Sequence, residues 1–143
     1  MKFWDSSALV PLVVDEASSS WARQQMKADR VAIIWGLSSV EIRSALARRH
    51  RDNALSTPDF RESRKQAERF FDSFTQVVAF EIARDRALRL LDLHDLRAAD
   101  ALQLAAALVA SDERPASLPF VTLDQRLAEA AEREGFAVVT LSE

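Results

Sequence analysis

The chain has 143 residues, 19 Lys and Arg against 22 Asp and Glu, a formal net charge of −3 and no cysteine. With 48% hydrophobic and 29% charged residues, it has the composition of one folded domain rather than a disordered chain. The lack of cysteine excludes a disulfide scaffold, a thiolate zinc site and a cysteine nucleophile, and two glycines are too few for a phosphate-binding glycine loop. The longest apolar run, residues 104–110, is too short to span a bilayer, and Asp5 stands where a signal peptide would be apolar. We therefore expect a cytoplasmic protein without membrane contact.

Apolar periodicity predicts short strands that alternate with helices along the chain. The five predicted strands are residues 3–4, 31–35, 77–80, 120–123 and 137–140. Helices are predicted at 6–14, around Trp21 and Met26, and at 38–51, 57–74, 83–91, 97–110 and 125–134. Strands separated by helices need crossover connections, so we expect a single α/β domain over residues 1–143 with a mostly parallel sheet covered on both faces.

Capping residues predict where these helices begin and end. Ser6 and Ser7 precede the first apolar helix, and Thr57 is followed by a proline at the first helical position. Gly135 is expected to close the helix at 125–134.

Four acidic residues fall at or near the carboxyl ends of predicted strands. Asp5 and Asp124 directly follow a strand, while Glu41 and Asp100 lie in the first turn of a helix. Sites in open parallel sheets form outside these strand ends, so the four acids are candidates to meet there. Structural interpretations compete: Asp5 and Asp124 are also suited to N-caps, and Glu41 stands three residues after Ser38, as in a capping box.

Asp100 is the acid least easily explained by structure alone. Its helix is apolar nearly all round and is therefore expected to be buried. Arg97, Asp100 and Gln103 recur at intervals of three residues and form one polar stripe on that helix. A carboxylate in such a place needs a partner, which is either a salt bridge from Arg97 or a group outside the chain.

Several carboxylates within a few Å repel one another unless a cation neutralises them. Oxygen-only ligands select Mg²⁺ or Mn²⁺ over zinc, and His50 and His94 lack the spacing of a zinc site. Such an ion orients a phosphodiester, helps to deprotonate water and stabilises the leaving oxygen. The joint pattern of acids therefore favours metal-dependent phosphodiester hydrolysis.

Four segments are similar to the motifs of the PIN-domain ribonucleases, and specifically to the VapC toxins of bacterial toxin–antitoxin pairs. They are residues 3–10, 38–46, 96–105 and 120–127, and their acids are Asp5, Glu41, Asp100 and Asp124. The third segment, Leu-Arg-Ala-Ala-Asp-Ala-Leu-Gln-Leu-Ala, is the most specific match. The order and spacing of the motifs agree over essentially the whole chain.

The resemblance implies a PIN-like three-layer α/β/α sandwich and a Mg²⁺- or Mn²⁺-dependent endoribonuclease that is the toxin of a type II toxin–antitoxin system. Its RNA-cleaving site would place Asp5, Asp100 and Asp124 at the metal, with Glu41 as a further ligand or as the group that orients water. Ser6 and Thr122 would hold a carboxylate or a phosphate oxygen, and Arg97 would contact a phosphate. The implied partners are RNA, a small VapB-like antitoxin and a second copy of the chain in a homodimer.

Two other functions stay open at this point: a PIN-domain RNA-processing nuclease without an antitoxin, and a non-catalytic PIN module that binds metal or protein. For each of two groups of residues, the sequence also allows two interpretations. The arginines of the third predicted helix either form a solvated helix end or steer phosphate; they are Arg43, Arg48, Arg49 and Arg51. A set of large apolar residues either belongs to the core or lines a groove for an antitoxin helix; they are Trp21, Met26, Phe70, Phe71 and Phe74.

Overall fold

The computed structural model describes residues 1–142 and contains one sheet of five parallel strands in the order β3-β2-β1-β4-β5. The strands are β1 (Lys2–Trp4), β2 (Ala32–Trp35), β3 (Thr75–Val77), β4 (Phe120–Val121) and β5 (Val138–Val139). β1 is central, and its Phe3 pairs with Ile33 of β2 on one side and Phe120 of β4 on the other. The predicted parallel α/β fold is confirmed.

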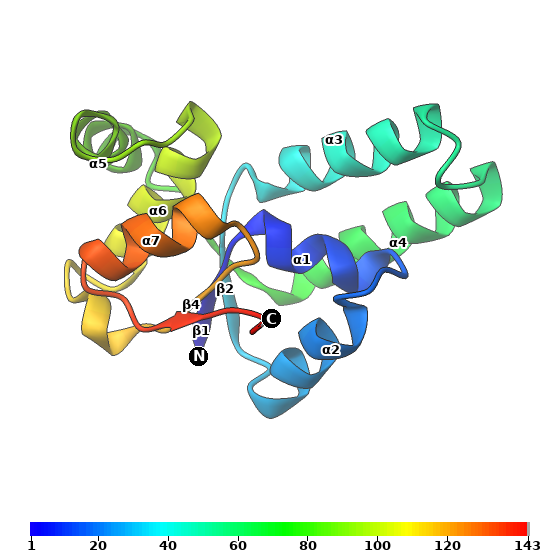
Figure 1. The fold of residues 1–143 in the computed structure, drawn as a ribbon, viewed down its shortest axis with the longest axis horizontal. Helices are drawn as coiled ribbons and strands as arrows, with labels where there is room; N and C mark the ends of the chain where they lie inside the picture. Colours follow the sequence, from blue (N-terminus) through cyan, green and yellow to red (C-terminus); the bar gives the residue numbers. More distant parts are fainter. Residues whose placement is uncertain (143) are drawn as a thin grey trace.

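Seven α-helices cover the two faces of the sheet (Figure 1). They are α1 (Ser6–Val13), α2 (Ser19–Ala28), α3 (Ser38–Arg51), α4 (Thr57–Ser73), α5 (Phe80–Leu93), α6 (Ala98–Ala110) and α7 (Gln125–Arg133), with a short 3-10 helix at Pro115–Ser117. Helices α1 to α4 pack on one face and α5 to α7 on the other, which gives the predicted three layers. Within residues 1–142, no helix is both long and apolar enough to cross a membrane.

Each face of the sheet has its own hydrophobic core. Successive strand residues point to opposite faces, so Phe3 packs toward α5 to α7 while Trp4 packs toward α1 to α4. The same alternation divides Phe120 from Val121 in β4. Burial on both faces explains why the strands are continuous apolar runs rather than alternating ones.

The third strand lies earlier than predicted. It spans Thr75–Val77 instead of 77–80, because its ladder with β2 ends where Trp35 pairs with Val77. The chain then leaves the sheet: Val78 is 75% exposed and Phe80 is the first residue of α5. The second strand begins at Ala32, one residue later than predicted, and the preceding Val31 is exposed; β4 and β5 are shorter than expected.

Two predicted helix caps are displaced by one or two residues. Asp5, not Ser6 or Ser7, caps α1, as the N-cap interpretation of Asp5 predicts: its carboxylate accepts a hydrogen bond of 3.3 Å from the Ser7 backbone N–H. Ser56, rather than Thr57, caps α4 and accepts from the Asp59 N–H. The predicted glycine stop after α7 is present: the φ of Gly135 is +101°, in the region that favours glycine.

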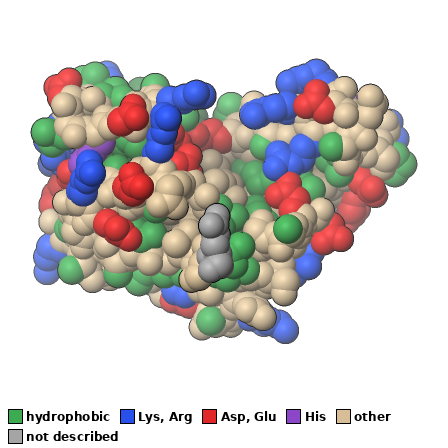
Figure 2. Space-filling view, viewed as in Figure 1, with side chains coloured by type: hydrophobic (Ala, Val, Ile, Leu, Met, Phe, Trp, Pro, Cys, Tyr) green, Lys and Arg blue, Asp and Glu red, His purple; other side chains and the backbone are tan. Residues whose placement is uncertain are grey.

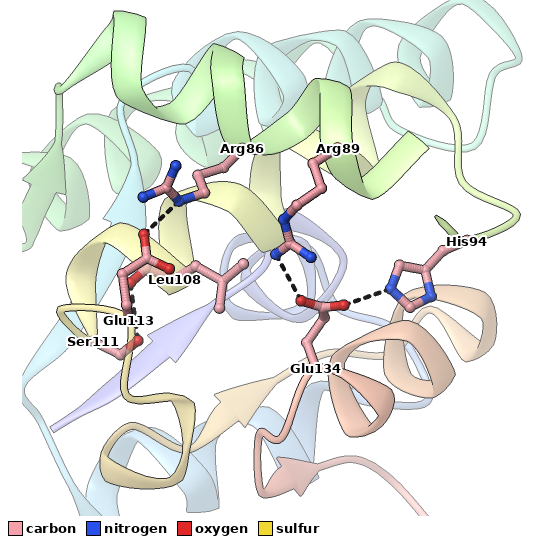
Figure 3. A network of polar contacts seen from close by, with 7 residues as sticks. All are labelled: Arg86, Arg89, His94, Leu108, Ser111, Glu113 and Glu134. Carbon is pink, nitrogen blue, oxygen red and sulfur yellow. Dashed lines mark hydrogen bonds and ion pairs between the residues drawn. The ribbon is translucent and has the colours of Figure 1, made fainter. Parts of the chain in front are cut away.

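A set of polar contacts connects α5 with the ends of α6 and α7 (Figure 3). Glu134, which ends α7, accepts 2.8 Å bonds from Arg89 of α5 and from the ring of His94. Arg86 of α5 pairs at 2.5 Å with Glu113, which follows α6. These contacts join α5 to the residue that follows α7 and to the residues that follow α6.

Candidate active site

The carboxyl ends of β1 and β4 lie side by side at the centre of the sheet, where Trp4 pairs with Val121. Asp5 follows β1 directly, and Asp124 stands three residues after Val121 at the start of α7. A cleft of about 1020 Å³ opens there, and Glu41 of α3 and Asp100 of α6 line it with them. In Figure 2 the surface is hollowed between the two helical layers, with acidic side chains at the floor and basic ones on both sides. The structure therefore brings the four acids predicted from the sequence to one cleft.

Asp5 lies at the bottom of the cleft and is only 3% exposed. Its Oδ2 accepts a hydrogen bond of 2.9 Å from Thr122 Oγ1 and two from Ser7, one of them from the hydroxyl. Burial raises the pKa of Asp5 to about 6 against the lowering effect of these hydrogen bonds, and the charges of Asp100 and Asp124 raise it further. These donors all bind Oδ2 of Asp5. The other carboxylate oxygen, Oδ1, lies 3.5 Å from Ser6 Oγ.

Ser7 and Thr122 connect the two strand ends behind Asp5. Ser7 Oγ accepts from the Leu123 N–H at 2.9 Å, and Thr122 Oγ1 accepts from the Asp124 N–H at 3.0 Å. Thr122 has no exposed surface, so its position suits holding the Asp5 carboxylate rather than touching a substrate. Sequence reasoning missed Ser7; the only signal for it is the second hydroxyl of the Asp5-Ser6-Ser7 run.

Glu41 is held by side chains from two other helices. Its Oε2 accepts from Ser6 Oγ of α1 at 3.3 Å and from Gln103 Nε2 of α6. The capping-box interpretation is wrong: Leu37 occupies the N-cap of α3, and the Ser38 hydroxyl accepts a 3.0 Å bond from Gln103 instead. Burial raises the pKa of Glu41 to about 7, against lowering hydrogen bonds from Gln103 and Ser6, while the Asp5 charge adds to the rise.

Asp124 both caps α7 and lines the cleft. Its Oδ1 accepts a 3.0 Å bond from the Leu127 N–H, as the N-cap interpretation predicts. Asp100 is partly buried, and burial and the Asp124 charge raise its pKa, whereas Arg97 and Arg126 lower it. Among the ion pairs of residues 1–142, none joins Arg97 to Asp100, although Arg97 lines the same cleft.

The arginines of α3 differ in whether they form ion pairs with acidic side chains of the protein. Arg49 binds Glu16 through Nε at 2.7 Å and Nη2 at 2.6 Å, and Arg43 contacts Glu68 at 3.3 Å. Arg48 is exposed, lines the cleft and makes no ion pair with the described residues. On the opposite side the cleft is lined by Arg97 and by Arg126, which approaches Asp95 at 3.7 Å.

The donor set of the cleft fits a hard divalent cation in its chemistry. All candidate ligands are carboxylate oxygens, which Mg²⁺ and Mn²⁺ prefer. Burial chiefly, and neighbouring acids in addition, raise the pKa values of Asp5, Glu41 and Asp100, and a bound cation would favour their charged forms. Within residues 1–142, however, no three acidic or histidine side chains stand close enough to form a closed ligand set. Ligation would therefore require these side chains to draw together.

Comparison with known proteins places the chain in a family. The model of the PIN domain matches residues 2–133, so the chain belongs to the PIN domain family. Within this family it is 30% identical, over 136 residues, to the Mycobacterium tuberculosis proteins Ribonuclease VapC45 and Ribonuclease VapC49. Each alignment covers 95% of this chain and 92% of the relative. The predicted resemblance to VapC proteins is thereby confirmed.

Two solved structures share the fold. A toxin-antitoxin complex from Klebsiella pneumoniae contains a chain that superposes with a TM-score of 0.67 at 18% identity, covering 100% of this chain and 99% of that one. The crystal structure of a protein from Pyrobaculum aerophilum superposes with a TM-score of 0.64 at 18% identity, covering 97% and 87%. Both likenesses extend over nearly the whole α/β/α sandwich.

Proposed function

We propose that this protein is a Mg²⁺- or Mn²⁺-dependent endoribonuclease and the toxin component of a type II toxin–antitoxin system. Its family membership, its similarity to two ribonucleases and the fold it shares with a chain of a toxin-antitoxin complex support this function. The observation on which it chiefly rests is that Asp5, Glu41, Asp100 and Asp124 line one cleft although they come from four segments of the chain.

In this proposal Asp5, Asp100 and Asp124 hold the cation, and Glu41 is a further ligand or orients the attacking water. The bound ion would supply Lewis-acid activation of water and charge neutralisation at the leaving oxygen. Thr122 and Ser7 donate hydrogen bonds to Oδ2 of Asp5, which would leave Oδ1 to bind the cation. No side chain of the protein has to act as a nucleophile.

Arginines on both sides of the cleft are suited to the RNA backbone. Arg97 and Arg126 lie at the starts of α6 and α7, and Arg48 lies across the cleft on α3. Guanidinium groups bind phosphate oxygens bidentately, so arginines that flank the acids would hold the phosphates on either side of the scissile bond. Arg49 also lines the cleft, but its guanidinium is engaged with Glu16, and we assign it a structural role.

A groove of about 800 Å³ between α2 and α4 of this protein is a candidate binding site for the antitoxin. Leu12, Met26, Phe70 and Phe74 supply its apolar lining, and its basic residues are Arg23, Lys27 and Arg30. An amphipathic helix with acidic flanks would complement this combination. All five apolar residues singled out in the sequence pack, half-buried, against the core, and of these only Trp21 and Phe71 do not line the groove.

The homodimer also remains a proposal. Several apolar side chains are more than half exposed near the start of α3 and the entry to α5, namely Val40, Val78, Phe80 and Ile82. A second copy of the chain that covered these two segments would remove the exposed apolar side chains from water.

Cleavage of RNA by purified protein tests the proposed function. Wild-type protein should cut RNA only with Mg²⁺ or Mn²⁺, EDTA should stop it, and Asp100→Asn should abolish it without unfolding the chain. Asp92→Asn, which removes an exposed acid on α5, is the matched control and should cleave normally. Cleavage in EDTA would refute the metal mechanism, and full activity of Asp100→Asn would refute the site.

Two further measurements separate the alternative functions. Mapping the ends of cellular RNAs after brief induction, with wild type and Asp100→Asn compared, identifies the target. A processing nuclease without an antitoxin would cut RNA but leave growth unaffected, whereas a non-catalytic module would cut nothing.

A further inference from the structure

Gln103 is the one polar side chain that α6 buries completely within the described residues. It has no exposed surface, and its neighbours Leu104 to Leu108 on the same helix are all apolar and buried. A primary amide removed from water is unfavourable unless hydrogen bonds replace the lost hydration. The side chain is therefore either satisfied by partners or retained for another purpose.

The amide nitrogen of Gln103 meets oxygens from two other helices. Nε2 lies 3.0 Å from Ser38 Oγ and 3.5 Å from Ser6 Oγ, and it also donates to Glu41 Oε2. In its ionised form the Glu41 carboxylate only accepts hydrogen bonds, so this orientation of the amide, with the nitrogen toward Glu41, suits the charged form. Through this one group α6 is tied to α1 and α3 at the floor of the cleft.

The other end of the amide is unpaired. Gln103 Oε1 is buried and has no hydrogen-bond partner among the described residues. A buried acceptor without a donor is rare in folded proteins and calls for an explanation. An apolar side chain of the same length would avoid this unsatisfied atom, so packing alone does not account for glutamine here.

We infer that Gln103 is a positioning residue that holds the Glu41 carboxylate by Oε2 so that its other oxygen faces the cleft. The inference rests on the proposed function in one respect, namely that the orientation of Glu41 serves metal binding. The hydrogen bond between Gln103 and Glu41 itself is present in the protein without metal. Hydrogen-bonding partners of metal-binding carboxylates fix their orientation, and loss of such a partner weakens metal binding by about 10- to 100-fold.

A double-mutant cycle tests whether Gln103 acts through Glu41. Gln103→Met keeps the length of the side chain and removes its donor, and Mn²⁺ binding to the full chain is measured by calorimetry for wild type, Gln103→Met, Glu41→Gln and the double variant. Gln103→Met should weaken Mn²⁺ binding about 10- to 100-fold. In the Glu41→Gln background the same substitution should have little further effect, because the group that it positions is gone. An undiminished effect there, or unchanged Mn²⁺ binding by Gln103→Met, would overturn the inference.

A control and a second readout separate the possible failures. Leu104→Met changes a buried neighbour on the same helix and should leave Mn²⁺ binding within twofold of wild type. Crystal structures of the metal-free wild type and Gln103→Met show directly whether Glu41 leaves its position beside Ser6. If wild type binds no Mn²⁺, the proposed function fails; if Glu41 keeps its conformation in Gln103→Met, the positioning role fails whatever the metal does.

Discussion

Thr122 Oγ1 donates a hydrogen bond of 2.9 Å to Asp5 Oδ2, although 117 positions of the sequence separate the two residues. The bond joins the ends of β1 and β4 at the base of the cleft. It is reinforced by Ser7, whose hydroxyl contacts Thr122 Oγ1 at 3.2 Å. The orientation of Asp5 therefore depends on how closely the two central strands end together.

Replacement of Thr122 by valine should lower both the stability of the protein and RNA cleavage, while the shape of the side chain stays nearly the same. Thr122→Val removes one donor to Asp5 and the acceptor of the Asp124 N–H, so we expect a loss of about 1–3 kcal/mol in the free energy of unfolding. RNA cleavage should fall as well, because the carboxylate is less firmly held. Thr122→Ser retains the hydroxyl and is the control. Equal activity of the valine and serine variants would show that the bond is dispensable.

The stability of the metal-free protein should decrease as the pH rises from about 4 to 7. Folding raises the pKa of Asp5 from 3.8 to about 6 and that of Glu41 from 4.5 to about 7, chiefly by burial. The folded state then binds more protons than the unfolded state in this window, so its stability is complete below the unfolded pKa values and is lost as the pH passes the folded ones. For Asp5 the loss is on the order of 3 kcal/mol. Denaturant unfolding across this pH range measures it.

Two further measurements, one with an Asp5 variant and one with added Mn²⁺, test the cause of this pH dependence. Asp5→Asn cannot ionise and should lose much of the pH dependence. Mn²⁺ should raise the melting temperature at pH 8, where the carboxylates are charged, and have little effect at pH 5. A melting temperature that Mn²⁺ leaves unchanged at pH 8 would argue against coupling between the acids and a cation.

Arg48 and Arg49 are adjacent in sequence but should behave differently. Arg48→Ala removes a cation that lines the cleft without an ion pair, so RNA binding should weaken and its salt dependence should drop by about one phosphate contact. Arg49→Ala breaks the contact with Glu16 and should mainly lower stability. Arg133→Ala, at the far end of α7 from the cleft, is the control. Fluorescence titrations of RNA onto a cleavage-deficient variant at several salt concentrations measure the difference.

The contacts around Glu134 should matter for stability and not for RNA cleavage. Hydrogen bonds from His94 and Arg89 outweigh the burial that would raise the pKa of Glu134, and hold it below the ordinary value of 4.5. A lowered pKa contributes stability above pH 4.5 that is lost as the pH falls through the folded value. Glu134→Gln should therefore cost about 1–2 kcal/mol at pH 7 and less at pH 4, as thermal unfolding at the two pH values will show.

Local sequence patterns predicted the order of the elements and singled out Asp5 and Asp124, because both depend on short-range features. Glu41 and Asp100 lie within helices and joined the predicted site through the pattern of four acids and its resemblance to PIN-domain motifs. Strands buried on both faces are apolar runs, and an acid directly after such a run is visible without knowledge of the fold. The third strand was placed too late because Val78 and Phe80 have strand-like side chains but face solvent. Their exposure depends on where β2 ends, which is a property of a neighbouring strand.

The supporting residues of the site were harder to predict because their partners are distant in sequence. Ser38 and Glu41 have the spacing of a capping box, but the donor that both use is Gln103, more than 60 positions away. Likewise nothing in the Ser6-Ser7 pair indicates that the second hydroxyl, and not the first, contacts Thr122. Local spacing fixes which residues share a helix face, but it does not specify which face another helix brings against it.

The cleft is bounded by helices from opposite sides of the sheet: Glu41 stands on α3 in one layer and Asp100 on α6 in the other. The separation of these two carboxylates is therefore set by the thickness of the sandwich at this edge. A sliding of one layer would change the gap between them, and the hydrogen bonds of Gln103 to Ser38 and Glu41 oppose it. A ligand that bridges both acids would thus act as a clamp on the whole domain, and amide hydrogens in α3 and α6 would exchange more slowly when it is bound.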